Sequence, residues 1–319
     1  MNNLVSIIMP VYNSDEFLTE SISSVLVQTY QNFELILIND DSTDKSLEIC
    51  KRMSNLDSRI ILFNNLDNLG PSKSRNQGIK IAKGKYITFI DADDIYAPNL
   101  IEELVLNLEN NKAEISTIGY SYNLEDIYEK QYNMNVQKHT VDYFISELCL
   151  NRKIKGFVWN KLYLKKVIDN NHILFNERLD YCEDYFFNLN YLEYITTGVV
   201  STNILYYYRQ LTGSLSHSIS LEKEKSIINL LESKKDFYLS LGKSRFAANL
   251  EMLISEKLIN LYCQNIKLKS KRKIQIKMIL HSDLFSLNKV FMFFVEKCKL
   301  SPKIYSLLLK IEYKTKLLK

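Results

Sequence analysis

Three aspartates within four residues, Asp91, Asp93 and Asp94, directly follow the apolar run Tyr86–Ile90. Carboxylates this close repel one another and cost stability unless a cation neutralises them. A hard divalent ion such as Mg²⁺ or Mn²⁺ takes oxygen ligands and commonly shares them with the phosphates of a nucleotide. The cluster is thus a candidate metal and diphosphate site, although a solvated acidic turn or helix start has the same pattern.

A second acidic pair, Glu183-Asp184, precedes a run of aromatic residues. One carboxylate of such a pair can act as a general base that takes the proton of an attacking hydroxyl, which typically accelerates a reaction by roughly 10²–10⁴-fold. A pair of this kind is also favoured at a helix N-terminus, where the helix dipole stabilises negative charge. The residues alone leave both interpretations open.

Strands and helices must alternate over residues 1–100 to position these carboxylates. Four apolar runs predict strands, and the segments between them predict helices: strands Leu4–Met9 (ended by Pro10), Phe33–Ile38, Arg59–Phe63 and Tyr86–Ile90, and helices 14–29 (Ser14 as N-cap), the segment after Asp44, and Ser72–Ala82. Near-continuous apolar strands indicate a parallel sheet covered on both faces. Ligands of such sheets bind beyond the carboxyl ends of the strands, where the acidic residues lie.

The rest of the chain has a weaker pattern. We expect a helix from Asn99, a strand near 115–120 and amphipathic helices near 140–150 and 184–194. After residue 220 the apolar residues fall only at helical spacing. The expected domains are therefore an α/β catalytic domain, residues 1–220, and an all-helical extension, residues 221–319.

Four segments occur in an order and spacing that resemble the family 2 glycosyltransferases over residues 4–217: VSIIMPVYN, ELILINDDSTDKS, DNLGPSKSRNQGIKIAKGKYITFIDADD and VWNKLYLKKVI. The resemblance implies a GT-A (Rossmann-like) α/β fold, with a mostly parallel sheet and helices on both faces. It also implies a nucleoside diphosphate sugar donor, most often a UDP-sugar, and a transfer that inverts the anomeric configuration.

The resemblance also implies roles for single residues on the nucleoside side of the site. By this likeness the loop under the nucleoside is Pro10, Val11, Tyr12 and Asn13, the uracil or ribose contact is Asp40, the loop facing the base includes Asn68 and Gly70, and Arg75 and Asn76 support the donor. A carboxylate at Asp40 can accept the imide N–H of uracil or a ribose hydroxyl. Asp41 stands where the family usually has glycine, and Asp tolerates a left-handed turn better than most residues.

The same likeness assigns the reacting groups. It makes Asp91 and Asp93 ligands of the Mn²⁺ or Mg²⁺ ion, with Asp93 preferred and His217 as a further ligand. It places Ala92 in the donor-binding site and Arg209 and Ser214 near the diphosphate, and it makes Asp184 the base, with Glu183 in support. The ion would neutralise the leaving UDP as its negative charge grows. Trp159 either lines the acceptor cleft or, by default, belongs to the core.

Charge is distributed unevenly along the chain. Residues 221–319 hold 21 Lys/Arg and 9 Asp/Glu, a net charge of +12, whereas residues 1–220 hold 20 and 28, a net charge of −8. Basic helices can rest on an anionic membrane surface or dock a protein partner, or they can simply form a solvated face. The basic part carries no nucleic-acid-binding motif, so nucleic acid is not an expected partner.

The five cysteines are odd in number and widely spaced, which favours a reducing compartment. With no secretory signal or apolar span visible, we expect a cytoplasmic enzyme that can bind peripherally at the inner face of the membrane. The predicted function is transfer of a hexose or N-acetylhexosamine from a UDP-sugar to a glycolipid, polysaccharide or glycoprotein acceptor. The alternatives are a nucleotidyltransferase or nucleotide-sugar hydrolase, and an inactive glycan-binding scaffold.

Overall fold

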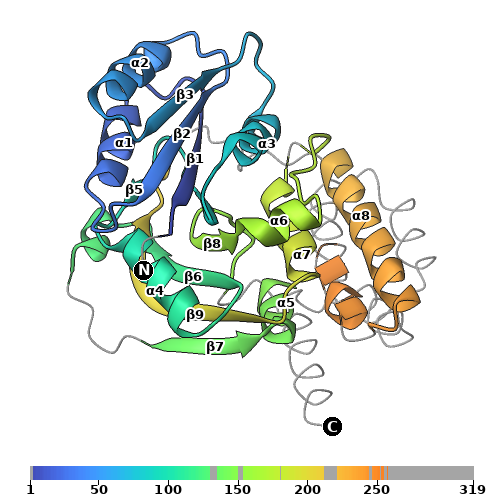
Figure 1. Cartoon of the computed structure of the whole chain (residues 1–319). Coiled ribbons are helices and arrows are strands. Elements are labelled where there is room, and N and C mark those ends of the chain that lie inside the picture. The colour runs from blue at the N-terminus through green and yellow to red at the C-terminus, as the bar shows by residue number, and fades with distance from the viewer. Residues whose placement is uncertain are drawn as a thin grey trace. The chain divides into compact units, whose positions relative to one another are not determined.

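The chain consists of two units, Met1–His217 and Ser218–Lys319. The computed structural model in Figure 1 describes residues 3–129, 135–149, 154–179, 181–211, 221–243, 246–251, 253–254 and 257. Within the described residues, all strands belong to the first unit, and the second contributes the helix α8 (Leu221–Ser240). None of the described helices has both the length and the apolar character needed to cross a bilayer.

Strands and helices alternate in the first unit. In chain order they are β1 (Val5–Val11), α1 (Leu18–Leu26), β2 (Phe33–Asn39), α2 (Ser46–Leu56), β3 (Ile60–Asn64), α3 (Pro71–Ile81), β4 (Tyr86–Phe89), β5 (Ile95–Tyr96), α4 (Leu100–Asn110), β6 (Ile115–Ser121), the 3-10 helix η1 (Leu124–Ile127), β7 (Val136–Thr140), α5 (Val141–Cys149), β8 (Lys161–Leu164), α6 (Lys165–Asn170), α7 (Glu183–Leu192) and β9 (Thr197–Tyr207). The expected βαβ order from β1 to β4 is confirmed, as are the helices near 140–150 and 184–194.

The strands form one mixed sheet in the order β3-β2-β1-β4-β8-β6-β9-β5, with β7 paired to β9. The pairings among β3, β2, β1 and β4 are parallel, as is that of β6 with β9, whereas β5, β7 and β8 run antiparallel to their neighbours. Because β8 is antiparallel to both β4 and β6, those two strands point the same way. The carboxyl ends of β2, β1, β4, β6 and β9 therefore lie at one edge of the sheet, the carboxyl edge.

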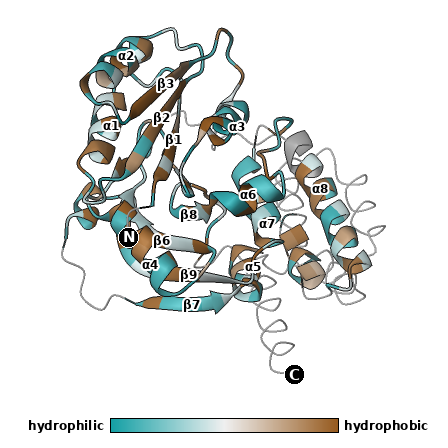
Figure 2. Ribbon diagram, in the orientation of Figure 1, coloured by the Kyte–Doolittle hydropathy of each residue, from teal (hydrophilic) through white to brown (hydrophobic). Residues whose placement is uncertain are grey.

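Helices cover both faces of the parallel part of the sheet, because its strands are hydrophobic on both sides (Figure 2). Val5 and Ile7 of β1 share a core cluster with Ile22 of α1. On the other face Ile8 packs against Gly78 of α3, so closely that a Cβ at Gly78 would lie 2.4 Å from Ile8 Cγ2. Figure 1 shows the result, with α1 and α2 on one side of these strands and α3 on the other.

Two local expectations at the end of β1 are wrong. Pro10 lies inside β1 and pairs with Ile38, because its missing N–H faces the β4 side, where the ladder has already ended at Ile8. The next helix begins at Leu18, and Ser14 does not cap it. Instead, the Ser14 N–H donates to Ser46 Oγ at 2.8 Å, which binds the loop after β1 to the start of α2.

Candidate functional site

The acidic residues after β4 are attached to the end of β9. Asp94 is fully buried, and its carboxylate accepts hydrogen bonds from the Tyr206 hydroxyl at 2.6 Å and from the Arg209 backbone N–H at 2.8 Å. Burial raises the pKa of Asp94 well above its ordinary value, and Asp91 and Asp93 raise it further. Asp94 therefore serves to hold the turn that presents Asp91 and Asp93 at the carboxyl edge.

Asp91 and Asp93 differ in their partners. Asp91 Oδ1 accepts a hydrogen bond from Arg75 Nη2 at 2.9 Å, and its side chain is 28% exposed. Burial and the neighbouring Asp91 raise the pKa of Asp93 to about 6. A carboxylate held in such surroundings is stabilised by a cation, so the residues present fit a divalent ion. In the described part of the chain no three acidic, His or Cys side chains form a complete metal cage, but Mg²⁺ and Mn²⁺ usually take only one or two carboxylates beside phosphate and water.

Arg75 of α3 joins the two acidic motifs. Its guanidinium lies 2.9 Å from Asp91, 3.1 Å from Glu183 and 3.3 Å from Asp184, and the side chain is 6% exposed. Burial alone lowers the pKa of Arg75, but Asp184, Asp91 and Glu183 together raise it. We call these carboxylates, with Asp93, Asp94 and Arg75, the acidic centre.

Asp184 lies in the first turn of α7, which follows a left-handed residue, Cys182, at φ 63°. Its Oδ1 is buried against Arg75 and accepts no hydrogen bond from a described residue, while Oδ2 accepts one long hydrogen bond from the Val158 N–H at 3.4 Å. Burial raises the pKa of Asp184 to about 7, with Arg75 opposing the shift and Glu183 adding to it. The side chain is thus poised to exchange a proton near neutral pH.

Two residues that the sequence did not single out, Lys161 and Asn188, hold the backbone around Asp184. The amine of Lys161, 1% exposed, donates to the carbonyls of Lys155 at 2.9 Å and Phe157 at 2.5 Å. Asn188 Nδ2 donates to the carbonyls of Gly156 and Asp184, each at 2.8 Å. Burial lowers the pKa of Lys161 to about 7, and the negative charge of Asp184 opposes that shift. What distinguishes Lys161 is that it is buried beside the buried Asp184. The sequence does not show this burial, because Lys and Asp residues are usually exposed.

The loop after β2 is organised by Asp40. This buried carboxylate accepts hydrogen bonds from Asn65 Nδ2 at 2.7 Å, the Leu69 N–H at 3.0 Å and the Gly70 N–H at 2.7 Å. Gly70 has φ 84°, a conformation that costs glycine little and lets α3 start at Pro71. We call these four residues the Asp40 group. Asp40 holds the predicted base-facing loop, which includes the exposed Asn68, and its contact with a nucleoside stays a prediction.

The loop after β1 lies beside that of β2. Val11 is fully buried, whereas Tyr12 is 49% exposed. Asn13, at φ 46°, accepts a hydrogen bond from the Thr43 N–H at 2.8 Å through Oδ1. Asp41 has φ 57°, which confirms the left-handed turn expected there. Within this loop the side chains of Tyr12 and Asn13 are therefore accessible, and buried Val11 can meet a ligand only through its backbone.

Arg209 is engaged on the surface beside the acidic centre. Its guanidinium donates to the Asp93 carbonyl at 2.7 Å and to Glu20 Oε2 at 2.6 Å, and it lies over the Phe17 ring. Its approach to a diphosphate stays a prediction. Ala92 is 6% exposed, and Ser214 and His217 lie outside the described residues.

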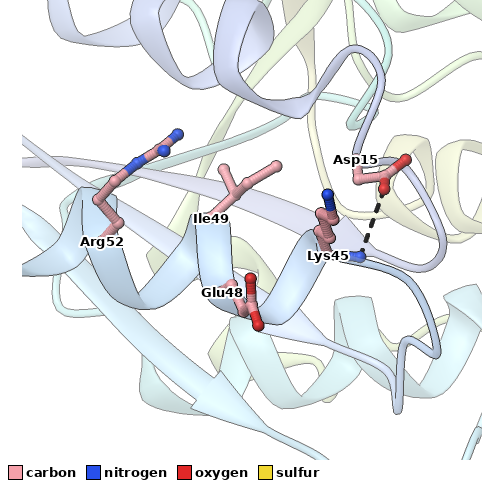
Figure 3. Close-up of a pocket in the computed structure, with 5 residues that line it drawn as sticks. All are labelled: Asp15, Lys45, Glu48, Ile49 and Arg52. Carbon is pink, nitrogen blue, oxygen red and sulfur yellow. Dashed lines mark hydrogen bonds between the residues drawn. The ribbon is translucent and has the colours of Figure 1, made fainter.

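A separate cavity of about 350 Å³ lies between the loop after β1 and α2. Its lining residues are mostly charged, and the Lys45 N–H donates to Asp15 Oδ2 at 3.4 Å across it (Figure 3). They are Asp15, Lys45, Glu48, Ile49 and Arg52. The lining includes none of the predicted site residues, so this cavity is distinct from the acidic centre.

Comparison with known proteins shows to which protein family the chain belongs. Residues 6–171 match the sequence profile of glycosyl transferase family 2. The chain belongs to this family. Glycosyltransferase GlyG of Streptococcus pneumoniae is 31% identical over 248 residues, which are 73% of this chain and 80% of GlyG. An uncharacterized glycosyltransferase of Haemophilus influenzae is 30% identical over 91% of this chain and 90% of its own length.

The fold of this family member also has a solved counterpart. S. aureus TarS 1-349, in a crystal structure with UDP-GlcNAc, superposes with a TM-score of 0.68 at 20% identity, over 86% of this chain and 78% of that one. At this identity the likeness shows the fold, which is of the GT-A type. The expected α/β architecture and glycosyltransferase class are therefore confirmed.

Proposed function

We propose that this glycosyltransferase moves a hexose or N-acetylhexosamine from a UDP-sugar to a hydroxyl of a saccharide acceptor, with inversion at the anomeric carbon. The observation that carries the proposal is the link made by Arg75. It holds Asp91, of the candidate metal and diphosphate site, and Asp184, the candidate base, within hydrogen-bond or ion-pair distance of one side chain. An inverting transfer needs these two functions on opposite sides of one sugar, close together.

The proposed donor site runs from the Asp40 group to the acidic centre along the carboxyl edge. These lie at the ends of β2 and β4, on either side of β1, a spacing that suits a nucleoside at one end and a diphosphate at the other. The UDP-GlcNAc complex of the structurally similar TarS supports UDP as the nucleotide. Tyr12 and Asn68 are the exposed side chains proposed to meet the base or ribose.

Asp93 and Asp91 are the residues proposed to hold Mg²⁺ or Mn²⁺, with His217 as the further predicted ligand. When bound, the ion would supply positive charge to the departing diphosphate. The chain's own contribution is to hold both carboxylates at one place, because Arg75 binds Asp91 and Asp94 anchors the turn that carries Asp91 and Asp93.

Asp184 Oδ2 is proposed to accept the proton of the acceptor hydroxyl. As the proton leaves, the acceptor oxygen forms its bond to the anomeric carbon, and the bond from that carbon to the diphosphate oxygen breaks. Oδ1 stays against Arg75, which orients the carboxylate and stabilises its charged form. Glu183 shares the same guanidinium and is proposed to support the acceptor or the donor.

The test is UDP release from a panel of UDP-sugars (glucose, galactose and their N-acetylamino forms), with Mn²⁺ and with chelator. We expect one donor to turn over, only with metal, and faster when a glycan acceptor is added. Release that no acceptor accelerates would indicate the nucleotide-sugar hydrolase. No release and no UDP binding by calorimetry would favour the inactive scaffold.

A further inference from the structure

Six aromatic side chains gather at the carboxyl edge, beyond the acidic centre. Trp159 stacks on Tyr206, Phe157 and Tyr208, with ring centroids 4.1, 4.6 and 5.4 Å away and planes within 20°. Tyr120 meets the Trp159 ring edge-on at 5.1 Å, and Tyr122 meets Tyr208 edge-on at 5.7 Å. We call these six residues the aromatic stack.

The aromatic stack has a buried part and an exposed part. Trp159 is 1% exposed and Tyr206 is fully buried, so the core interpretation of Trp159 is confirmed. Phe157 and Tyr208 are half-buried with near-parallel rings 6.0 Å apart, and Tyr122 is 55% exposed. A buried layer thus supports a second layer of rings that reaches the surface.

The position of the stack suits the acceptor. Its residues come from the carboxyl ends of β6 and β9 and from the segment before β8, which lie past β4 in the sheet order and away from the Asp40 group. Phe157 precedes Val158, whose N–H contacts Asp184, and Tyr206 donates to Asp94. A ligand on the exposed rings would therefore lie beside the proposed base, on the side opposite the nucleoside.

The chemistry of the surface selects the ligand. A pyranose ring has an apolar C–H face that packs on an aromatic face and a rim of hydroxyls that suits phenol groups. A polyol phosphate has no ring face, and its negative charge would meet Asp91, Asp93 and Glu183. Near the stack, Arg75, Lys161 and Arg209 are each already held by carboxylate or carbonyl oxygens.

We propose that the half-buried rings of Phe157 and Tyr208 and the exposed ring of Tyr122 bind a neutral pyranose residue of the acceptor, directly beside Asp184. This subsite rests on the proposed function, because it assigns the acceptor of the same reaction. It makes the acceptor a glycan with a terminal or penultimate sugar ring rather than a charged polyol chain.

The test uses Trp159, the single tryptophan of the chain, as a reporter under the exposed rings. The full-length protein, saturated with UDP and Mn²⁺, is titrated with methyl glucopyranoside, methyl N-acetylglucosaminide and cellobiose, and separately with ribitol 5-phosphate and glycerol 3-phosphate. We expect at least one pyranoside to change the Trp159 emission saturably. Saturable binding of the polyol phosphates alone, or of none of the probes, would overturn the proposal.

Variants sharpen the test. Tyr122→Leu keeps apolar bulk but loses the ring, and we expect it to weaken pyranoside binding roughly 2- to 10-fold, whereas Tyr122→Phe should bind as the wild type does. Tyr194→Leu is the matched control, since Tyr194 is 50% exposed and precedes β9 at the opposite edge of the sheet. Equal affinity in Tyr122→Leu and wild type would contradict the subsite. UDP turnover with no pyranoside response would contradict the subsite alone. Pyranoside binding without UDP turnover would keep the sugar-binding surface, but would contradict the proposed function and with it the role of that surface as the acceptor site.

Discussion

The Asp40 group and the acidic centre lie at the same edge of the sheet but are stabilised in opposite ways. The Asp40 carboxylate is satisfied by three N–H donors of its own chain. The acidic centre brings three carboxylates, those of Asp91, Glu183 and Asp184, to one guanidinium, and burial and neighbouring negative charge raise the pKa of Asp93 and Asp184. The carboxylate of the first region has its hydrogen bonds without a ligand, whereas the second region keeps uncompensated negative charge until a cation binds.

This difference has a functional meaning. A preformed loop can select a nucleoside with little reorganisation on binding. A centre that lacks positive charge can favour a metal-bound diphosphate and bind it only as that complex. We therefore infer that recognition resides mainly in the Asp40 group and that the chemistry depends on the acidic centre.

The largest expected effect comes from the base. Asp184→Asn keeps the shape but removes the proton acceptor, so we expect transfer to fall roughly 10²- to 10⁴-fold. UDP affinity should change little, because Asp184 is not among the residues proposed to contact the nucleotide. Initial rates of transfer and UDP calorimetry on the same preparation check this. Transfer within threefold of wild type would assign the base elsewhere.

Removal of Arg75 should cost the most stability. Arg75→Met leaves Asp91, Glu183 and Asp184 without their shared cation, and breaking a buried pair typically costs about 3–5 kcal/mol. Denaturant unfolding measures it, with Lys165→Met as the control. Lys165 pairs with Asp169, which is 48% exposed, so its loss should cost no more than about 1 kcal/mol. An equal loss of unfolding free energy in the two variants would contradict the inference that the acidic centre depends on Arg75.

Sequence patterns predicted the strands that carry both regions. The strands β1 to β4 are continuous apolar runs, and the residues at their carboxyl ends were expected to form the site. The strand β8 was missed, because it is short and begins with Lys161, a residue that is usually exposed but is here buried. The role of Arg75 as a link depends on α3 and α7 approaching one another, which no local pattern reveals.

A smaller effect is expected in the Asp40 group. In Asp40→Asn an amide N–H₂ replaces one acceptor oxygen, so one of the three donors is left unpaired, at a cost of about 1–3 kcal/mol. We also expect weaker binding of uridine and an unchanged requirement for Mn²⁺. The exposed carboxylate variant Asp169→Asn serves as the control for stability. A changed metal requirement in Asp40→Asn would break the separation between the two regions.

The smallest expected effect is on the pH profile. Asp184 must be ionised to act as base, and its pKa is raised to about 7, so kcat/KM should rise with pH through about 7. Lys161→Met removes a positive charge that favours the ionised carboxylate, which should move this midpoint upward by a few tenths of a unit. A midpoint that moves downward, or a profile that falls with pH, would contradict the assignment.

The most direct test of the central claim compares uridine with UDP. Both are titrated into the wild-type protein with Mn²⁺ and with chelator, because under the proposal uridine reaches only the Asp40 group and UDP reaches both regions. We expect Mn²⁺ to strengthen UDP binding at least tenfold and to leave uridine binding unchanged. Equal dependence of both ligands on Mn²⁺, or none for UDP, would contradict the account.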